Sequence, residues 1–340
     1  MKKHTSINEV ALVAGVSIAT VSRYINTPDQ VAKKTQLKVE SAIRQTGYTP
    51  NTIAQKLRRG RSHHILVAVP SVGDPFFSAV MRGVRGAARQ RGYTVFIRET
   101  RHEALTTREM HAVLDSKQAD GIVLLNNMTF IAGKPGLSTD PRRRPSAIHI
   151  DNVAAAVTMT NFLVEHGHRR IAMIFSGKKP SFIDRERGYH TAMRAAGLDV
   201  ADELVIDAEN SLEGGREAAR SLLGLEAPPT AIFCGSDEIA IGCMHEIHAA
   251  GLRVPSDISV AGFDDTRYAA VSNPPLTTIR QPAEKMGARL VEKLCLALED
   301  DSDGIGAGVI VPHQLVKSIG DIMIISKAAV PSYNPDDPDE

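Results

Sequence analysis

The 340-residue sequence contains no long apolar segment and few cysteines. No apolar run approaches the roughly 20 residues that a membrane-spanning helix requires, and the first ten residues lack the apolar stretch of a signal peptide. The three cysteines, Cys234, Cys243 and Cys295, include no C-x-x-C pair, which argues against a disulfide framework and against a zinc site. We therefore expect a soluble, cytoplasmic protein with no membrane partner, whose cysteines are reduced and buried.

Motifs of common enzyme classes are also missing. The sequence has no nucleophile elbow, no P-loop and no G-x-G-x-x-G fingerprint. The adjacent carboxylates Asp264 and Asp265 are the candidates for acid–base catalysis, and the enzyme alternative depends on them. His166 and His168 stand two residues apart at the end of a helical stretch, where a C-terminal cap is more common than a metal pair. We predict a protein that is not an enzyme and that uses no cofactor or metal.

The positive charge is concentrated at one end of the chain. Residues 1–64 contain eleven Lys or Arg against three acidic residues, a net charge of +8, whereas the remaining 276 residues carry a net charge of −7. Cationic side chains gain affinity for phosphates by releasing counterions. We therefore expect residues 1–64 to bind a polyanion, and a merely solvated basic surface is the alternative.

Hydrophobic spacing in this basic segment predicts three short helices. Apolar residues between positions 7 and 14 follow i, i+3, i+4, i+7 spacing, and Gly15 supplies a stop signal. Ser17 caps a second helix, and a third helix covers about residues 35–46. Two short helices joined by a turn, with a supporting third, make a helix-turn-helix unit.

The outward face of the second helix suits the major groove of DNA. A helix about 10 Å wide fits this groove, and its first turn meets the base edges. Ile18 and Ala19 offer apolar contact to a thymine methyl group, and Arg23 reaches a guanine or a phosphate. The predicted DNA-contacting residues of this helix are Ser17, Ile18, Ala19, Thr20, Ser22, Arg23 and Asn26. A three-helix module that binds protein is the alternative.

Two motifs carry a family resemblance. The pattern VAxxAGVSxATVSR stands at residues 10–23, and GYxPNxxAxxL follows at residues 47–57. Together they resemble the N-terminal module of the LacI/GalR family of transcriptional repressors, and the resemblance continues with gaps to about residue 316. It implies a sequence-specific repressor that responds to a small molecule. Because helix-turn-helix dimers read two half-sites, we expect a homodimer on a pseudo-palindromic double-stranded operator.

Residues 50–61 form the expected linker. Asn51 caps a helix of about two turns, which is too short to be stable alone in water. The resemblance implies that this helix folds only when it pairs with its copy on DNA, with Leu57 wedged into the minor groove and kinking the duplex. Asn51, Ala54, Leu57 and Arg58 complete the predicted DNA-contacting set. An unstructured tether is the alternative.

From His64 onward, short apolar runs alternate with helical stretches. The runs suit strands buried on both faces, at residues 65–70, 93–97, 121–125, 170–175, 230–234 and 258–263. This alternation predicts parallel sheets flanked by helices, which bind ligands at the carboxyl ends of their strands. We predict an α/β protein with an all-α helix-turn-helix head and a two-lobed core like that of periplasmic binding proteins.

The expected domain boundaries follow from these segments. They are 1–49 for the helix-turn-helix domain, 50–61 for the linker, 62–326 for the effector-binding and dimerisation core, and 327–340 for a disordered acidic tail. Within the core, the N-terminal lobe covers about 62–151 and 281–308, and the C-terminal lobe covers about 152–280 and 309–326.

Polar and aromatic side chains follow the predicted strand ends. Carboxylates accept hydrogen bonds from hydroxyls, an arginine donates in a fork and a phenyl ring covers an apolar face, a mixture that suits a polyhydroxylated ligand. The family match assigns effector contact to Asp74, Phe76, Asp151, Arg187, Ser236, Asp264 and Gln281. For Asp74 a role in the turn before Pro75 is the alternative, and Asp237 is expected to cap its helix.

The core motifs are most similar to the nucleoside-responsive branch of the family, so we expect a nucleoside as effector, with a sugar as the second choice. Two departures bear on this expectation. Residues 126–150 are too short for the helix, strand and loop that relatives carry here, so a strand of the N-terminal lobe is expected to be missing, and an RxS motif near the C-terminus is not reproduced. A ligand-only solute-binding protein of the same two-lobed fold is the alternative, but it would need an export signal and no DNA module.

Overall fold

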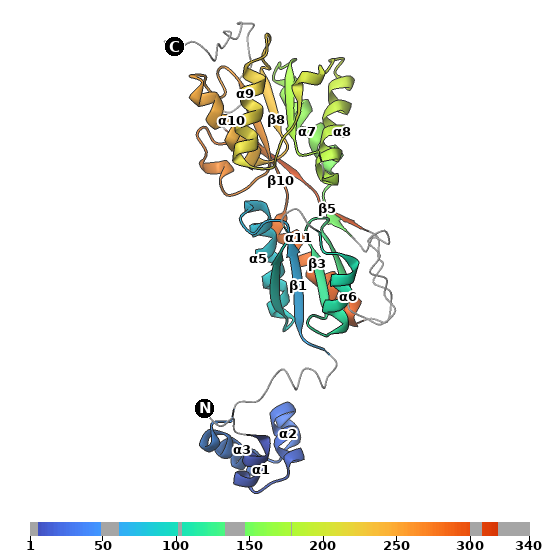
Figure 1. The fold of residues 1–340 in the computed structure, drawn as a ribbon, viewed down its shortest axis with the longest axis vertical. Helices are drawn as coiled ribbons and strands as arrows, with labels where there is room; N and C mark the ends of the chain where they lie inside the picture. Colours follow the sequence, from blue (N-terminus) through green and yellow to red (C-terminus); the bar gives the residue numbers. More distant parts are fainter. Residues whose placement is uncertain are drawn as a thin grey trace. The chain divides into compact units, whose positions relative to one another are not determined.

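The computed structural model describes residues 6–48, 61–100, 104–132, 147–177, 179–299 and 308–318 (Figure 1). The chain divides into two units, Met1–Ser62 and His63–Glu340. No helix in the described ranges is long and apolar enough to cross a membrane. The predicted linker contacts and the predicted acidic tail lie outside the described residues; they are Asn51, Ala54, Leu57, Arg58 and residues 327–340.

Between residues 6 and 48 the smaller unit contains three α-helices around a small apolar core. They are α1 (Ile7–Ala14), α2 (Ile18–Asn26) and α3 (Lys33–Thr46), with a 3₁₀ turn, η1 (Pro28–Gln30), between α2 and α3. Gly15 ends α1 with a left-handed backbone (φ +62°), and the Ser17 hydroxyl accepts a hydrogen bond from a backbone N–H in the first turn of α2. Val10, Val21 and Val39, one from each helix, are fully buried. The predicted helix-turn-helix unit is confirmed.

The larger unit has two lobes, and the N-terminal lobe is built on a four-stranded sheet (Figure 1). In spatial order the strands are β2 (Thr94–Glu99), β1 (His64–Val69), β3 (Gly121–Leu124) and β4 (Thr129–Ala132). The first three are parallel, and β4 is antiparallel to β3. The flanking helices are α5 (Pro75–Gln90), α6 (Thr107–Asp115) and α11 (Ala283–Glu299). Alternate residues of β1 serve the two faces, since Val67 belongs to the core with α5 and α11 and Ala68 packs with α6.

The C-terminal lobe is built on a six-stranded sheet. In spatial order its strands are β12 (Gln314–Val316), β10 (Thr277–Arg280), β9 (Ser259–Asp264), β8 (Ala231–Cys234), β6 (Ile171–Phe175) and β7 (Val205–Asp207). All neighbours are parallel except β10 and β12. The helices are α7 (Asn152–Glu165), α8 (Pro180–Ala195), α9 (Leu212–Leu223) and α10 (Asp237–Ala249), with 3₁₀ turns η2 (Asp202–Leu204) and η3 (Ala269–Val271). As predicted, all three cysteines are buried and free.

The chain passes between the lobes at three places within the described residues. A short parallel pair, β5 (Ile148–His149) and β11 (Val309–Ile310), precedes two of the crossings, which lead into α7 and β12. The third crossing runs from β10 through Gln281 into α11. Each lobe is therefore assembled from separate stretches of sequence, and the predicted two-lobed α/β architecture is confirmed.

Residues 125–132 contain a strand that the sequence analysis did not predict. After β3 the chain reverses through a turn in which Met128 has φ +52°, and β4 returns along β3 with all four of its residues buried. A short hairpin therefore occupies this edge of the sheet. Residues 133–146 lie outside the described ranges, so the expected loss of a family strand stays a prediction.

Candidate nucleic-acid interface and ligand-binding cleft

The first turn of α2 is exposed and carries short side chains. Ile18 is 49% exposed, Ser17 and Ala19 are also exposed, and the hydroxyl oxygens of Ser17 and Thr20 are 2.9 Å apart. Arg23 lies further along α2, is exposed, and has no carboxylate within 4 Å among the described residues. This face combines apolar, hydroxyl and guanidinium groups, which are the groups that contact base edges and phosphates.

Ser22 and Asn26, the other predicted contacts on α2, are half-buried. The Asn26 amide nitrogen donates to the Ser22 carbonyl at 2.7 Å and lies 3.3 Å from its hydroxyl. These bonds hold the last turn of the helix. Within residues 6–48, the first turn of α2 and Arg23 are therefore the predicted contacts most open to a partner.

In the larger unit, Arg185 of α8 organises a buried polar cluster. Its side chain is 5% exposed. Its Nε atom donates to the Asn152 side-chain oxygen at 2.9 Å, and its Nη1 atom donates to the Gly235 carbonyl. Its Nη2 atom lies 3.8 Å from Oδ1 of Asp264. One guanidinium thus connects the start of α7, the end of β8 and the end of β9.

Two aromatic rings lie against the Arg185 guanidinium. Its central carbon lies 3.6 Å from the ring centroid of Phe263 and 4.9 Å from that of Phe182. Burial lowers the pKa of Arg185 to about 10, while the charges of Asp264, Asp237 and Asp74 act in the opposite direction. The guanidinium therefore remains charged at neutral pH, beside Asp264 and the two rings.

Asp264 and Gln281 form the next layer of this cluster. The Gln281 amide nitrogen donates to Oδ1 of Asp264 at 2.6 Å. Burial raises the pKa of Asp264 well above its ordinary value, although Arg185 acts against this shift. Asp264 and Asp265 have φ values of +113° and +53°, in the left-handed region that non-glycine residues rarely adopt. The strained backbone at the end of β9 aims the carboxylate toward the crossing that contains Gln281.

Asp74 caps the start of α5 and also lies close enough to Arg185 to feel its charge. Its Oδ1 atom accepts hydrogen bonds from the N–H groups of Phe76 at 2.8 Å and Phe77 at 3.3 Å, which caps the start of α5. Burial raises its pKa, and the charges of Lys179 and Arg185 oppose this effect. The cap at Pro75 is therefore confirmed, and the same carboxylate also feels the charge of Arg185.

Ser236, rather than Asp237, caps α10. The Ser236 hydroxyl accepts a hydrogen bond from the Ile239 N–H at 3.2 Å and donates to the Asn210 side-chain oxygen at 2.6 Å. The expectation that Asp237 caps this helix is wrong, because the cap position precedes the first helical residue and that residue is Asp237.

Asp237 instead lies fully buried beneath the loop after β9. Its two carboxylate oxygens accept hydrogen bonds from the Thr278 hydroxyl and the Thr266 N–H, each at 2.6 Å. Burial raises its pKa to about 7, although these hydrogen bonds favour the ionised form. Asp237 therefore ties α10 to β10 and to the loop that follows Asp264.

Asp151 caps α7 by accepting a hydrogen bond from the Ala154 N–H at 2.9 Å, and it is exposed. Its charge acts on His313, whose pKa is lowered by burial and raised by Asp151, with burial dominant. The Nε2 atom of His313 lies 3.3 Å from the Thr158 hydroxyl of the same helix. Asp151 is thus placed near the crossing that leads into β12.

His166 and His168, at the end of α7, make hydrogen bonds to different partners and do not form a metal-binding pair. His166 is the C-cap of α7, and its Nδ1 atom lies 2.7 Å from the Phe162 carbonyl oxygen. His168 is buried, and its Nδ1 atom lies 3.0 Å from the Thr230 hydroxyl. The predicted cap role of His166 is confirmed.

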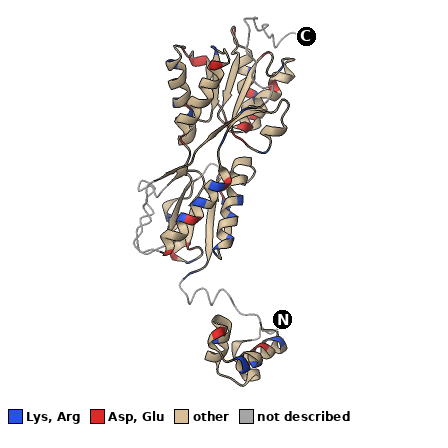
Figure 2. Ribbon diagram, turned by 180° about the vertical axis from the view of Figure 1, so that it is seen from behind, with Lys and Arg blue, Asp and Glu red and all other residues tan. Residues whose placement is uncertain are grey.

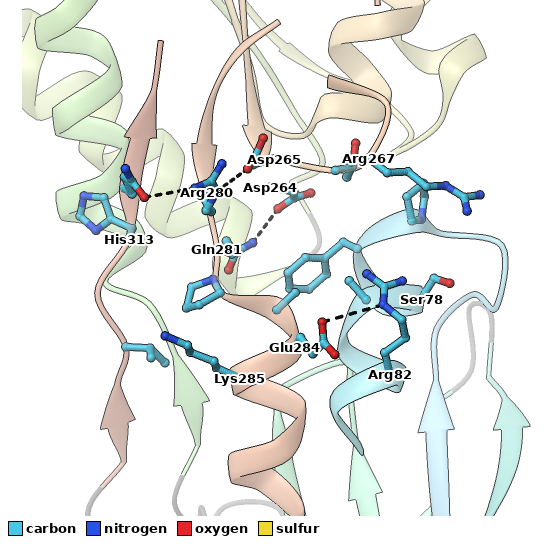
Figure 3. Close-up of a pocket in the computed structure, with 18 of the residues that line it drawn as sticks. Ser78, Arg82, Asp264, Asp265, Arg267, Arg280, Gln281, Glu284, Lys285 and His313 are labelled. Atoms are coloured by element: carbon cyan, nitrogen blue, oxygen red, sulfur yellow. Dashed lines mark hydrogen bonds and ion pairs between the residues drawn. The ribbon is translucent and has the colours of Figure 1, made fainter. Parts of the chain in front are cut away.

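A cavity of about 970 Å³ opens between the two lobes (Figure 3). The N-terminal lobe contributes the first turns of α5 and α11, and the C-terminal lobe contributes the ends of β9 and β10. Phe76, Asp264 and Gln281, three of the seven predicted effector contacts, line it. This volume suits a small organic ligand, and the wall combines an aromatic ring with hydrogen-bonding and charged groups.

Comparison with known proteins matches two parts of this chain. Residues 6–51 match the model of bacterial regulatory proteins of the lacI family, and residues 160–317 match a periplasmic-binding-protein-like domain. The HTH-type transcriptional repressor CytR of Escherichia coli (strain K12) is 36% identical over 317 residues, which cover 89% of this chain and 92% of the relative. The chain belongs to the LacI family.

This LacI-family protein has further similar relatives. The ribose operon repressor of Escherichia coli (strain K12) is 33% identical over 303 residues, covering 85% of this chain and 92% of the relative. The crystal structure of the lac repressor dimer bound to operator and the anti-inducer ONPF has a TM-score of 0.80 and 26% identity, covering 94% of this chain and 100% of that one. The chain is therefore a DNA-binding transcriptional regulator, as the sequence predicts.

The structure of the LacI-family protein places Arg187 away from the cleft cluster. Its side chain is 66% exposed and pairs with Asp184 on the same helix at 3.1 Å. Two residues along an α-helix turn by about 200°, so Arg185 and Arg187 project from nearly opposite sides of α8. The prediction that Arg187 joins these polar side chains is wrong, and Arg185 takes that place.

The helical period carries a signal that identifies Arg185. Phe182, Arg185 and Tyr189 are spaced i, i+3 and i+7 and are all buried on the inner face of α8. A lone arginine within an apolar stripe requires a buried partner, because an unpaired buried charge is costly. No comparable sequence signal marks Asn152 or Phe263, which meet Arg185 only in the tertiary structure.

Proposed function

We propose that this LacI-family protein is a homodimeric repressor that binds a pseudo-palindromic operator and whose operator affinity is set by a small polyhydroxylated effector, a nucleoside or a sugar. One observation carries the proposal: a single chain joins an exposed helix-turn-helix surface to a cavity walled by Asp264 and Gln281, with Arg185 behind them. The first part supplies contacts to bases, and the second supplies donors and acceptors for hydroxyl groups.

On the operator, α2 lies in the major groove with its first turn on the base edges. The contacts come from Ser17, Ile18, Ala19, Thr20, Ser22, Arg23 and Asn26. The linker contacts the minor groove through Asn51, Ala54, Leu57 and Arg58, with Leu57 wedged between base pairs. The similarity to a lac repressor dimer bound to operator supports this arrangement.

The effector lies in the cavity between the lobes. Asp264 and Gln281 bind its hydroxyl groups, and the ring of Phe76 covers an apolar face. Arg185 keeps Asp264 in place from behind. Asp74, Asp151 and Ser236 cap α5, α7 and α10 and are the remaining proposed contacts.

The open edge of the N-terminal sheet suits a second copy of the chain. Among the described residues, β2 has a strand neighbour on one side only, and its Phe96 and Ile97 are 48% and 51% exposed. Val72, 57% exposed, lies beside the end of β2, since its N–H donates to Glu99 at 3.1 Å. Exposed edges with large apolar side chains are sites of association. We place the dimer contact of the N-terminal lobe here.

Regulation in this proposal is a coupling between two sites. An effector that bridges Phe76 of one lobe and Asp264 of the other changes the relation between the lobes, and this change reaches the linker and its paired copy. Couplings of this kind are typically about 1 to 3 kcal/mol, or roughly 5- to 150-fold in affinity.

The test is a fluorescence titration of an operator selected from random duplexes, with and without a panel of nucleosides and sugars. We expect at least one ligand to change the operator dissociation constant by roughly 5- to 150-fold, and the operator to change the affinity for that ligand by the same factor. If every ligand that binds the protein leaves operator affinity unchanged, the effector role is wrong.

A further inference from the structure

The cavity between the lobes holds more positive charge than its own carboxylates neutralise. Its wall carries four cationic side chains and three carboxylates (Figure 3). The cations are Arg82, Arg267, Arg280 and Lys285, and the carboxylates are Asp264, Asp265 and Glu284.

Each of the three carboxylates already has a cationic partner. Asp265 is ion-paired with the Nε atom of Arg280. Glu284 lies 4.0 Å from the Nε atom of Arg82. Asp264 faces the buried guanidinium behind the cavity wall at 3.8 Å. Within each pair the two charges cancel. The cation that pairs with Asp264 is Arg185, which lies outside the cavity wall.

Lys285 and Arg267 are the two cations that remain. Both are exposed, and neither has a carboxylate within 4 Å in the part of the chain that the structure describes. Arg267 donates to the Tyr268 hydroxyl at 2.6 Å and lies over its ring at 4.7 Å, contacts that orient the guanidinium without neutralising it. Lys285 stands in the first turn of α11, on the opposite lobe.

Two helices also begin at this cavity. α5 starts at Pro75 and α11 at Ala283, and both residues are part of the wall. The positive end of the α11 dipole adds to the charge of the unpaired cations, whereas the Asp74 carboxylate caps the start of α5. Within its helical residues α5 carries arginines and no acidic residue, and Asp74, directly before them, is the carboxylate that offsets the dipole at this end (Figure 2 colours basic residues blue and acidic residues red).

We propose that the ligand of this cavity is a phosphorylated sugar or nucleoside, whose phosphate is bound by Lys285 at the start of α11 while Asp264 and Gln281 bind its hydroxyl groups. The inference rests on the proposed effector function of the same cleft. A phosphate monoester carries a charge of about −1.5 to −2 near neutral pH and offers three acceptor oxygens. A neutral sugar leaves both cations unpaired. A phosphate forms an ion pair with Lys285 and is also attracted, over a longer distance, by the charge of Arg267 on the other lobe.

Isothermal titration calorimetry with matched ligand pairs tests this. The pairs are ribose and ribose 5-phosphate, glucose and glucose 6-phosphate, and cytidine and cytidine 5′-monophosphate, with inorganic phosphate as a further probe. For at least one pair we expect the phosphorylated member to bind the full chain roughly tenfold more tightly or better, since hydrogen bonds to charged groups are strong. We expect inorganic phosphate alone to bind weakly.

The variant Lys285→Met should remove most of this preference and leave the affinity for the neutral member within about twofold. Lys293→Met is the matched control, because Lys293 lies two turns further along α11 and outside the cavity wall. Arg267→Gln should have a smaller effect than Lys285→Met, of roughly threefold, because long-range attraction is screened by salt.

The proposal is overturned if, in every pair that binds, the neutral member binds as tightly as its phosphate ester, or if Lys285→Met and Lys293→Met behave alike. The regulatory function survives that result whenever the neutral ligand still changes operator affinity. If neither member of any pair binds, the proposal is also overturned, and the effector function is then judged by the wider panel of nucleosides and sugars.

Discussion

The Nη2 atom of Arg185 lies 3.8 Å from Oδ1 of Asp264, and the two side chains are only 5% and 11% exposed. The pair joins the inner face of α8 to the end of β9. On its other side the same carboxylate oxygen accepts a hydrogen bond from Gln281 at 2.6 Å, at the crossing between the lobes. The Asp264 carboxylate at the cleft wall is therefore held by α8 of the C-terminal lobe and by the crossing that leads into α11.

Replacing Arg185 by Met should be costly, whereas the same change at Arg187 should not. Without Arg185 the buried carboxylates Asp264 and Asp237 lose their counter-charge, so the free energy of unfolding should fall by about 3 to 5 kcal/mol and ligand binding should be lost. Arg187→Met removes only an exposed ion pair and should change stability by less than about 1 kcal/mol. Urea unfolding and calorimetry of both variants measure these effects. Equal losses of stability and of ligand binding in the two variants would contradict the role given to Arg185.

The buried carboxyl of Asp237 predicts a pH-dependent stability. Its pKa in the folded protein is about 7, above the ordinary value of 3.8, so the folded state retains a proton that the unfolded state releases between those values. The stabilisation from this group is therefore present at low pH and is lost as the pH rises from about 4 to about 7. Asp237→Asn should abolish this loss and be more stable than the natural protein at pH 8, by on the order of 1 to 4 kcal/mol.

Urea unfolding at pH 4 and pH 8 separates the two proteins. The natural protein and Asp237→Asn should have similar stability at pH 4 and different stability at pH 8. Parallel pH profiles for the two would show that Asp237 does not titrate in this range.

The contact between α5 and α11 depends on glycine. A Cβ atom on Gly83 would lie 1.9 Å from the Glu284 carbonyl oxygen, and one on Gly287 would lie 2.1 Å from the Val80 carbonyl oxygen. Gly83→Ala should therefore separate the helices that form the cavity wall and destabilise the core by roughly 2 to 4 kcal/mol. Gly86→Ala is the matched control.

Gly86 lies on the same helix, and a Cβ atom there would meet nothing within 4 Å. The control variant should gain about 0.5 to 1 kcal/mol from the better helix propensity of alanine. Thermal unfolding measures both variants, and a shift in the same direction for both would mean that the helices are not in close contact.

The exposed edge of β2 predicts the site of dimerisation. Phe96→Asp places a charge on the apolar edge and should shift the protein from dimer to monomer in analytical ultracentrifugation. Leu296→Asp is the control, because Leu296 is 53% exposed on α11 and away from this edge. A dimer that survives Phe96→Asp but not Leu296→Asp would move the interface to α11.

Much of the fold could be predicted from local patterns. Gly15 and Ser17 end and begin helices where turn and cap chemistry require, and each predicted apolar run forms a strand. The prediction that these strands are buried on both faces is wrong for β2, an edge strand that is largely exposed. β4 was missed because a four-residue strand carries too weak a pattern, and its place depends on pairing with β3.

The cleft could be predicted in part. Asp264 and Gln281 follow strand ends, and topology alone brings such positions to the ligand-binding edge of a sheet. The choice of Arg185 over Arg187 depends on the phase of α8. The unpaired charge of Lys285 appears only when the partners of every cation on the wall are known, which requires the tertiary structure.

Sequence-specific binding is tested most directly by comparing two affinities of the full chain at about 0.15 M salt. One is the affinity for a selected operator, the other is the affinity for random-sequence duplex, and their ratio is the measurement. We expect a ratio of roughly 10³ or more, lost when residues 1–60 are removed and reduced by Arg23→Gln. Arg44→Gln, which removes an ion pair with Glu40 on α3, should leave the ratio unchanged. A ratio near one for the full chain, or an unchanged ratio after removal of residues 1–60, would contradict the assignment of DNA recognition to the helix-turn-helix unit.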